Sequence, residues 1–201
     1  MSHFDPEKIR RDFPILQQQV HGQPLVYLDS AATTQKPQVV IDALDHYYRE
    51  DNSNVHRAAH ALADRATTAF ENARKTIAAF IGSPKAEQII WTRGTTESIN
   101  LVASSYGRIA LQPGDKILVS MLEHHSNIVP WQLIAAERGA SVIPIPIDNR
   151  GDLDLAAYKA LLDERVKMVA VNHVSNALGT VNPIKDMVRE AHAVGAKVLV
   201  D

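Results

Sequence analysis

Four polar clusters in this sequence combine side chains that could bind an anion, move a proton or pair with a charged ring. They are Arg93-Gly94-Thr95-Thr96, Glu123-His124-His125-Ser126-Asn127, His173-Val174-Ser175-Asn176 and the single residue Asp201. Each follows a short apolar run that is typical of a buried strand. Because ligands of open α/β sheets bind beyond the carboxyl ends of the strands, the sequence predicts one polar edge that carries all four clusters.

Gly94, Thr95 and Thr96 lie between a predicted strand and a predicted helix. Gly94 permits a tight turn, and the amides and hydroxyls of the two threonines would face the helix N-terminus, where anions bind. This motif indicates a phosphate cradle, and it is equally compatible with a plain threonine helix cap. No Walker loop and no Gly-x-Gly-x-x-Gly follows any strand, so neither ATP nor a dinucleotide is indicated.

His124 and His125 allow three interpretations. They could form an imidazole lid over a planar cofactor that also moves protons, they could bind a metal, or they could be ordinary loop histidines. His56, His60 and His173 would be the partners in a metal site, and the four-residue spacing of His56 and His60 fits one face of a helix.

Asn176 and Asp201 complete the predicted edge. Asn176 could hydrogen-bond a ligand, or it could simply form a turn. A buried carboxylate at the position of Asp201, directly after a strand, needs a partner. A protonated ring nitrogen would supply that partner, and capping of a following helix is the alternative.

Strands and helices alternate from residue 88 onward. The predicted strands are 88–91, 116–120, 141–147, 166–171 and 197–200, and the predicted helices are 95–111, 127–138, 153–163 and 183–194. This alternation predicts a mostly parallel α/β sheet with right-handed crossovers and helices on both faces. Before it, the sequence predicts helices near 6–13, 37–47 and 62–81 and a hairpin formed by 15–20 and 24–28. We expect residues 1–30 to form an N-terminal helix and hairpin segment, and residues 31–201 to form the first part of a larger domain.

Composition and charge argue against several classes of protein. Hydrophobic residues make up 45% of the 201 residues, and the net charge of -2 without a Lys/Arg cluster does not favour a nucleic-acid partner. No apolar run is long enough for a membrane span, and the first residues lack the pattern of a secretory signal. The chain has no cysteine, so it contains no disulfide or thiolate metal site. A cytoplasmic location is therefore expected.

In combination, the motifs resemble the fold-type I, class V aminotransferase-like enzymes that use pyridoxal 5'-phosphate (PLP). They are most similar to the Suf-type cysteine desulfurases and their selenocysteine lyase relatives. The matching segments are Tyr27–Pro37, Asn54–Arg57 with His60, Arg93–Asn100, Glu123–Trp131, His173–Gly179 and Lys197–Asp201. The resemblance implies the large domain of a PLP-dependent transferase, preceded by the helical and hairpin segment.

The resemblance also implies roles for particular residues. Thr95 and Thr96 match the phosphate-binding pair of the family. His124 matches the imidazole that stacks on the cofactor ring and moves protons, which makes it the candidate catalytic residue. Asp201 matches the carboxylate that pairs with the pyridine nitrogen and keeps the ring an electron sink. Asn176 matches a residue near the cofactor and the amino-acid portion of the substrate.

The implied reaction removes sulfur from L-cysteine and leaves alanine, with L-selenocysteine as an alternative substrate. A cysteine thiolate of the enzyme takes the sulfur as a persulfide, and an acceptor protein receives it for iron–sulfur cluster assembly. A homodimer is implied as well. The alternatives are another class V PLP enzyme, such as a selenocysteine lyase, an aminotransferase or a kynureninase-like hydrolase, a metal-dependent hydrolase, and a non-catalytic binding or dimerisation module.

Three residues that the family uses in catalysis have no counterpart in this chain. They are the Schiff-base lysine, the persulfide cysteine and the arginine that binds the substrate carboxylate. Lys197 begins the strand that Asp201 follows, so the two lie roughly 13 Å apart and Lys197 is at the wrong edge. We therefore expect this chain to be a truncated large domain that forms no lysine–cofactor bond and is inactive alone.

Overall fold

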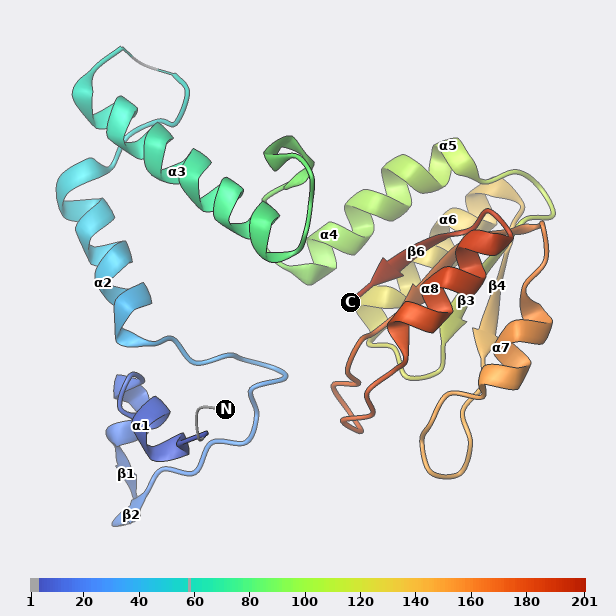
Figure 1. The fold of residues 1–201 in the computed structure, drawn as a ribbon, viewed down its shortest axis with the longest axis horizontal. Coiled ribbons are helices and arrows are strands. Elements are labelled where there is room, and N and C mark those ends of the chain that lie inside the picture. The colour runs from blue at the N-terminus through green and yellow to red at the C-terminus, as the bar shows by residue number, and fades with distance from the viewer. Residues whose placement is uncertain (1–3, 58) are drawn as a thin grey trace. The chain divides into compact units, whose positions relative to one another are not determined.

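The computed structural model describes residues 4–57 and 59–201, and the chain divides into two units, Met1–Trp91 and Thr92–Asp201 (Figure 1). The first unit is helical with one small hairpin, and the second is built around a β-sheet. The division at residue 30 that the sequence suggests stays a prediction. In the described part of the chain, every helix is too short or too polar to pass through a bilayer.

The first unit contains the three helices that the sequence predicts. Its elements are α1 (Pro6–Arg10), η1 (Pro14–Gln17), β1 (Gln19–Val20), β2 (Gln23–Pro24), α2 (Gln38–His46), η2 (Tyr47–Asp51), α3 (Ala61–Phe80) and η3 (Ala86–Gln88). The Asp5 carboxylate caps α1 by accepting from the amides of Glu7 and Lys8 at 3.1 and 3.2 Å. Gly82, with φ of 71°, provides the left-handed residue after α3.

Three local predictions in the first unit are wrong. The strand expected over 88–91 is not formed, because none of the strands in the described residues pairs with this segment, and Ile90 is 68% exposed. The first hairpin strand is shorter than expected, since Pro14 begins a 3-10 helix. His56 and His60 do not share a helix face, because His56 lies in a turn with φ of 60° and His60 caps α3.

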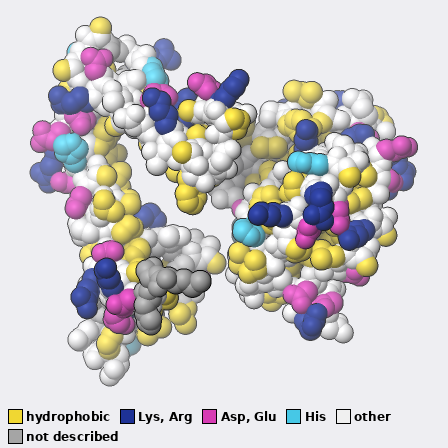
Figure 2. Space-filling view, in the orientation of Figure 1, with side chains coloured by type: hydrophobic (Ala, Val, Ile, Leu, Met, Phe, Trp, Pro, Cys, Tyr) yellow, Lys and Arg dark blue, Asp and Glu magenta, His cyan; other side chains and the backbone are white. Residues whose placement is uncertain are grey.

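Hydrophobic side chains are exposed along the helices of the first unit, where Figure 2 shows them in yellow. On α2, Val39 is 70% and Leu44 is 57% exposed, and Phe80 at the end of α3 is 85% exposed. Apolar surface of this extent is typical of segments that pack against other protein surface.

The second unit carries a four-stranded parallel sheet with the strand order β4-β3-β5-β6. Its strands are β3 (Lys116–Ser120), β4 (Ser141–Ile145), β5 (Val166–Val171) and β6 (Lys197–Val200). Its α-helices are α4 (Thr95–Val102), α5 (Arg108–Ala110), α6 (Val129–Arg138), α7 (Leu155–Leu161) and α8 (Ile184–Ala193). A π-helical segment, η4 (Ala103–Gly107), joins α4 to α5, and a 3-10 helix, η5 (His125–Asn127), precedes α6. The predicted α/β alternation from residue 95 onward is therefore confirmed.

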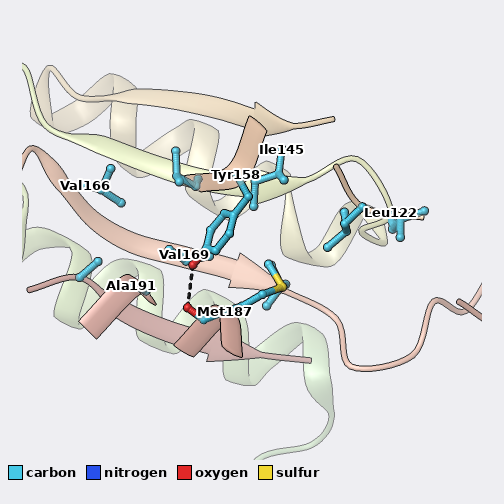
Figure 3. Packing of buried hydrophobic residues seen from close by; sticks show 11 residues of the cluster. Leu122, Ile145, Tyr158, Val166, Val169, Met187 and Ala191 are labelled. Carbon is cyan, nitrogen blue, oxygen red and sulfur yellow. Dashed lines mark hydrogen bonds between the residues drawn. The ribbon is translucent and has the colours of Figure 1, made fainter. Parts of the chain in front are cut away.

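Helices cover both faces of this sheet, as the short apolar strands predict. Along β3, Leu118 packs into a cluster with residues of α7 and α8, whereas Ile117 and Val119 pack into a second cluster with residues of α4 and α6. Tyr158 of α7 lies inside the first cluster, and its hydroxyl donates to the Met187 carbonyl of α8 at 2.8 Å (Figure 3). Each fully buried Val, Leu, Ile or Met side chain on these faces stabilises the fold by about 1.5–3 kcal/mol.

Candidate active site

A cavity of about 510 Å³ opens at the carboxyl edge of the sheet in the second unit. Its lining joins the start of α4 with the end of β6, and consists of Thr92, Gly94, Thr95, Ser98, Ile99, Val102, Leu199, Val200 and Asp201. An adjoining pocket of about 540 Å³ shares Gly94 and Thr95 and also contains Thr96. These volumes lie in the range of cavities that bind cofactors and other small molecules.

The N-terminus of α4 is open toward these cavities. Gly94 stands at the cap position, and no side chain of the described residues caps the first amides of the helix. The positive end of the helix dipole and the hydroxyls of Thr95 and Thr96 therefore remain available to an anion. Beside them, hydrogen bonds from the Arg93 side chain and then from its amide hold the pKa of Glu97 below its ordinary value.

Asp201 lines the cavity across from this helix end. Its backbone continues the ladder of β6 against β5: its amide donates to the Val171 carbonyl at 2.9 Å, and the His173 amide donates to its carbonyl at 2.8 Å. Among the described residues, the Asp201 carboxylate forms no hydrogen bond with another protein group. The structure thus holds the backbone of Asp201 in place and leaves an anionic group in the cavity.

His124 and Asn176 are exposed and line neither cavity. The His124 Nδ1 accepts from the Ser126 amide at 3.2 Å, so the proton of a neutral His124 ring lies on Nε2. The His124 and His125 rings meet edge to face, with 5.7 Å between their centroids. Asn176 lies in the turn between Val174 and Val181. The roles of His124 and Asn176 remain predictions.

Glu123, to which the sequence motifs assign no role, is 9% exposed beside this edge. The Ser120 hydroxyl donates to its Oε1, the Asn172 amide donates to the same oxygen at 2.8 Å, and the Asn127 side-chain amide donates to Oε2 at 2.7 Å. Burial raises the pKa of Glu123, these three hydrogen bonds oppose the rise, and the charge of Asp201 adds to it. The sequence does not predict the burial of Glu123, because a glutamate beside two histidines is typical of an exposed loop.

Two further asparagines extend the buried network. The Asn172 side chain donates to the Leu122 carbonyl at 2.7 Å, and the Asn182 side chain donates to the Asn172 carbonyl at 2.9 Å. The ends of β3 and β5 and the chain leading into α8 are therefore connected through polar groups. No cluster of three or more His, Asp or Glu side chains in the described ranges is arranged to bind a metal ion.

Comparisons with known proteins agree with this fold. The family model for aminotransferase class-V matches residues 26–201. A cysteine desulfurase of Dickeya dadantii (strain 3937) is 55% identical over 201 residues, which are 100% of this chain and 49% of that protein. The apo structure of a cysteine desulfurase from Thermococcus onnurineus NA1 is 40% identical, with a TM-score of 0.90. The match covers 100% of this chain and 48% of the Thermococcus chain.

A crystal structure of a cysteine desulfurase from Escherichia coli is also 40% identical, with a TM-score of 0.85. The match covers 100% of this chain and 49% of the Escherichia coli chain. The chain thus spans about half the length of these three proteins. The predicted fold class, a mostly parallel sheet with helices on both faces, is the one that these structures share. The match over residues 26–201 shows that the chain belongs to the aminotransferase class-V family.

Proposed function

We propose that the protein carrying this chain is a PLP-dependent cysteine desulfurase of the Suf type. The observation that supports this most is the cavity that brings Thr95, at the uncapped start of α4, together with Asp201, at the end of β6. One side of the cavity offers donors to an anion, and the other offers an anion to a cation. A phosphorylated ring with a protonated nitrogen is complementary to both sides.

The residues present fit PLP. Thr95 and Thr96 would hold the phosphate at the dipole of α4, and the Asp201 carboxylate would hold a proton on the pyridine nitrogen. His124 would stack on the ring, and its Nε2 would carry protons to and from the substrate. Asn176 would orient the substrate or the cofactor through its amide. When bound, PLP supplies an electron sink for the electrons of the substrate α-carbon.

The proposed substrate is L-cysteine, and the products are alanine and a persulfide. The chain contains no cysteine, so the thiol that accepts the sulfur would come from another part of the protein or from its partner. We propose a homodimer, a cytoplasmic location and a sulfur-acceptor protein that serves iron–sulfur cluster assembly. The alternative is another class V enzyme, such as a selenocysteine lyase or an aminotransferase.

Product analysis on the full-length protein tests this function. With PLP, cysteine and a reductant, we expect sulfide and alanine in equal amounts. Asp201→Ala should lower the rate by at least about 100-fold, because the group that holds the proton on the ring is lost. Asp186→Ala is the control, since Asp186 is exposed on α8 and lines neither cavity. Alanine formed from selenocysteine alone would favour the lyase, and absence of alanine with both substrates would refute both.

A further inference from the structure

Glu123 takes the place of a strand partner at the edge of the sheet. β3 pairs with β5 as far as Val119 opposite Ala170, and β3 ends at Ser120. Beyond β5, the backbone N–H of Asn172 donates to Glu123 Oε1 at 2.8 Å. The carboxylate therefore satisfies a buried amide that has passed the end of the neighbouring strand, and the backbone beyond β5 stays extended.

The opposite side of the same backbone carries Asp201. Val171 accepts from the Asp201 amide and His173 donates to the Asp201 carbonyl, whereas Asn172 between them bonds to Glu123. This is the alternation that an extended strand imposes on its backbone groups. We propose that Glu123 is a positioning residue: its carboxylate fixes the backbone of residues 171–173, and that backbone fixes Asp201 at the cavity.

The surroundings of Glu123 are complementary to a carboxylate. Ser120 and Asn172 donate to one oxygen, and the Asn127 amide donates to the other. The orientation of the Asn127 amide follows from Trp131, whose indole N–H can only donate and does so to Asn127 Oδ1 at 2.9 Å. The Asn127 nitrogen is thereby directed at Glu123, and a donor in place of the carboxylate oxygen would be repelled.

Glu123 also fixes the loop that carries the neighbouring residue His124. Asn172, which donates its backbone amide to Glu123, donates its side-chain amide to the carbonyl of Leu122 at 2.7 Å. The loop and the end of β5 are therefore bonded to each other twice, at Leu122 and at Glu123, directly before His124. Burying the Glu123 carboxylate costs desolvation free energy and so opposes stability. We therefore assign Glu123 a positioning role rather than a stabilising one.

Three variants of the full-length protein separate this role from general stability. Glu123→Gln keeps the shape but turns one oxygen into a donor that faces the Asn127 amide. The double variant Glu123→Gln with Asn127→Asp restores the match, because the new carboxylate at position 127 accepts from both Trp131 and the new amide. Glu164→Gln is the control, since Glu164 is exposed before β5 at the opposite edge of the sheet.

Hydrogen exchange of the backbone gives a readout that does not depend on activity. In Glu123→Gln, we expect exchange at least about tenfold faster over residues 171–176 and 198–201, because the side chain repelled by Asn127 no longer holds its oxygen at the Asn172 amide. We expect no change over β4, which this side chain does not contact by hydrogen bonds. The double variant should restore slow exchange, and Glu164→Gln should match the parent. Unchanged exchange at 171–176, or equal acceleration over β4, would overturn the proposal.

The kinetic readout rests on the proposed function. For cysteine desulfuration, Glu123→Gln should lower kcat about tenfold with little change in KM, since a small displacement of a site group acts on the chemical step. The absorbance band of bound PLP should change with it, and both should recover in the double variant. An inactive parent protein would refute the desulfurase function, while the exchange experiment would still decide the role of Glu123.

Discussion

Replacing Tyr158 by phenylalanine should destabilise the protein at neutral pH and stabilise it at alkaline pH. Tyr158 is fully buried between α7 and α8, and its hydroxyl donates to the Met187 carbonyl at 2.8 Å. At neutral pH, Tyr158→Phe loses this hydrogen bond, so the free energy of unfolding should fall by about 1 kcal/mol.

In alkaline solution, ionisation of the buried Tyr158 hydroxyl lowers the stability of the parent protein. The variant has no such hydroxyl and keeps its stability. Burial, together with the nearby charge of Glu190, raises the pKa of Tyr158 from 10.0 to about 12. Because the folded pKa lies above the unfolded one, the contribution is fully present below the unfolded pKa and is lost as the pH rises through the folded one. A difference of about two pKa units corresponds to about 2.7 kcal/mol. The free energy of unfolding of the variant should therefore equal that of the parent at about pH 11 and exceed it at higher pH.

Urea unfolding of parent and variant at matched pH values measures this difference directly. Other effects of alkaline pH occur in both proteins and cancel in the comparison. Tyr106→Phe is the control, since Tyr106 is 36% exposed and its hydroxyl has no hydrogen-bond partner among the described residues. A stability difference for Tyr158→Phe that stays constant from neutral to alkaline pH would refute the reasoning.

Three other predictions follow from separate features. Hydrogen bonds from Lys116 and then Arg165 lower the pKa of Asp163 to about 2, so this stabilisation is present above the unfolded pKa and is lost as the pH falls through the folded one; Asp163→Asn should flatten the acid side of a urea-midpoint profile, and an unchanged slope would contradict this. A side chain at Gly107 would meet Ile134 Cγ1 at 3.0 Å, so Gly107→Ala should destabilise by about 1–3 kcal/mol in thermal unfolding, whereas a raised Tm would show that α6 yields freely. The isolated 201-residue chain, given PLP, cysteine and reductant, should release no sulfide above a protein-free control, and release above that level would show that the missing lysine and cysteine are dispensable.

The elements of the second unit could be predicted because local pattern determines them. β3, β5 and β6 begin and end where the sequence places them, since strands covered on both faces are apolar runs bounded by polar residues. The segment 88–91 has the same pattern and forms no strand. A strand also needs a hydrogen-bonded neighbour, and the pattern of a segment contains no information about its neighbours.

The site was only partly accessible from the sequence for the same reason. Asp201 follows the parallel strand β6, as the sequence predicts, and the structure places Thr95 at the same cavity although the strand predicted before it does not form. The role proposed for Glu123 depends on register between distant segments: β3 and β5 pair as far as Val119 and Ala170, and the Asn172 amide beyond them bonds to Glu123. Motifs reveal which residues can do chemistry, whereas the partners of those residues depend on strand order.

The strand order also determines how the sheet can grow during synthesis. β3 is the first strand of this sheet to be made, and β4, the second, pairs with one of its edges. β5 then adds to the free edge of β3, and β6 adds to the free edge of β5. Every strand joins an edge that already exists, and none has to insert between two paired strands. The sheet can therefore assemble in the order in which a ribosome releases its strands, without undoing an earlier pairing.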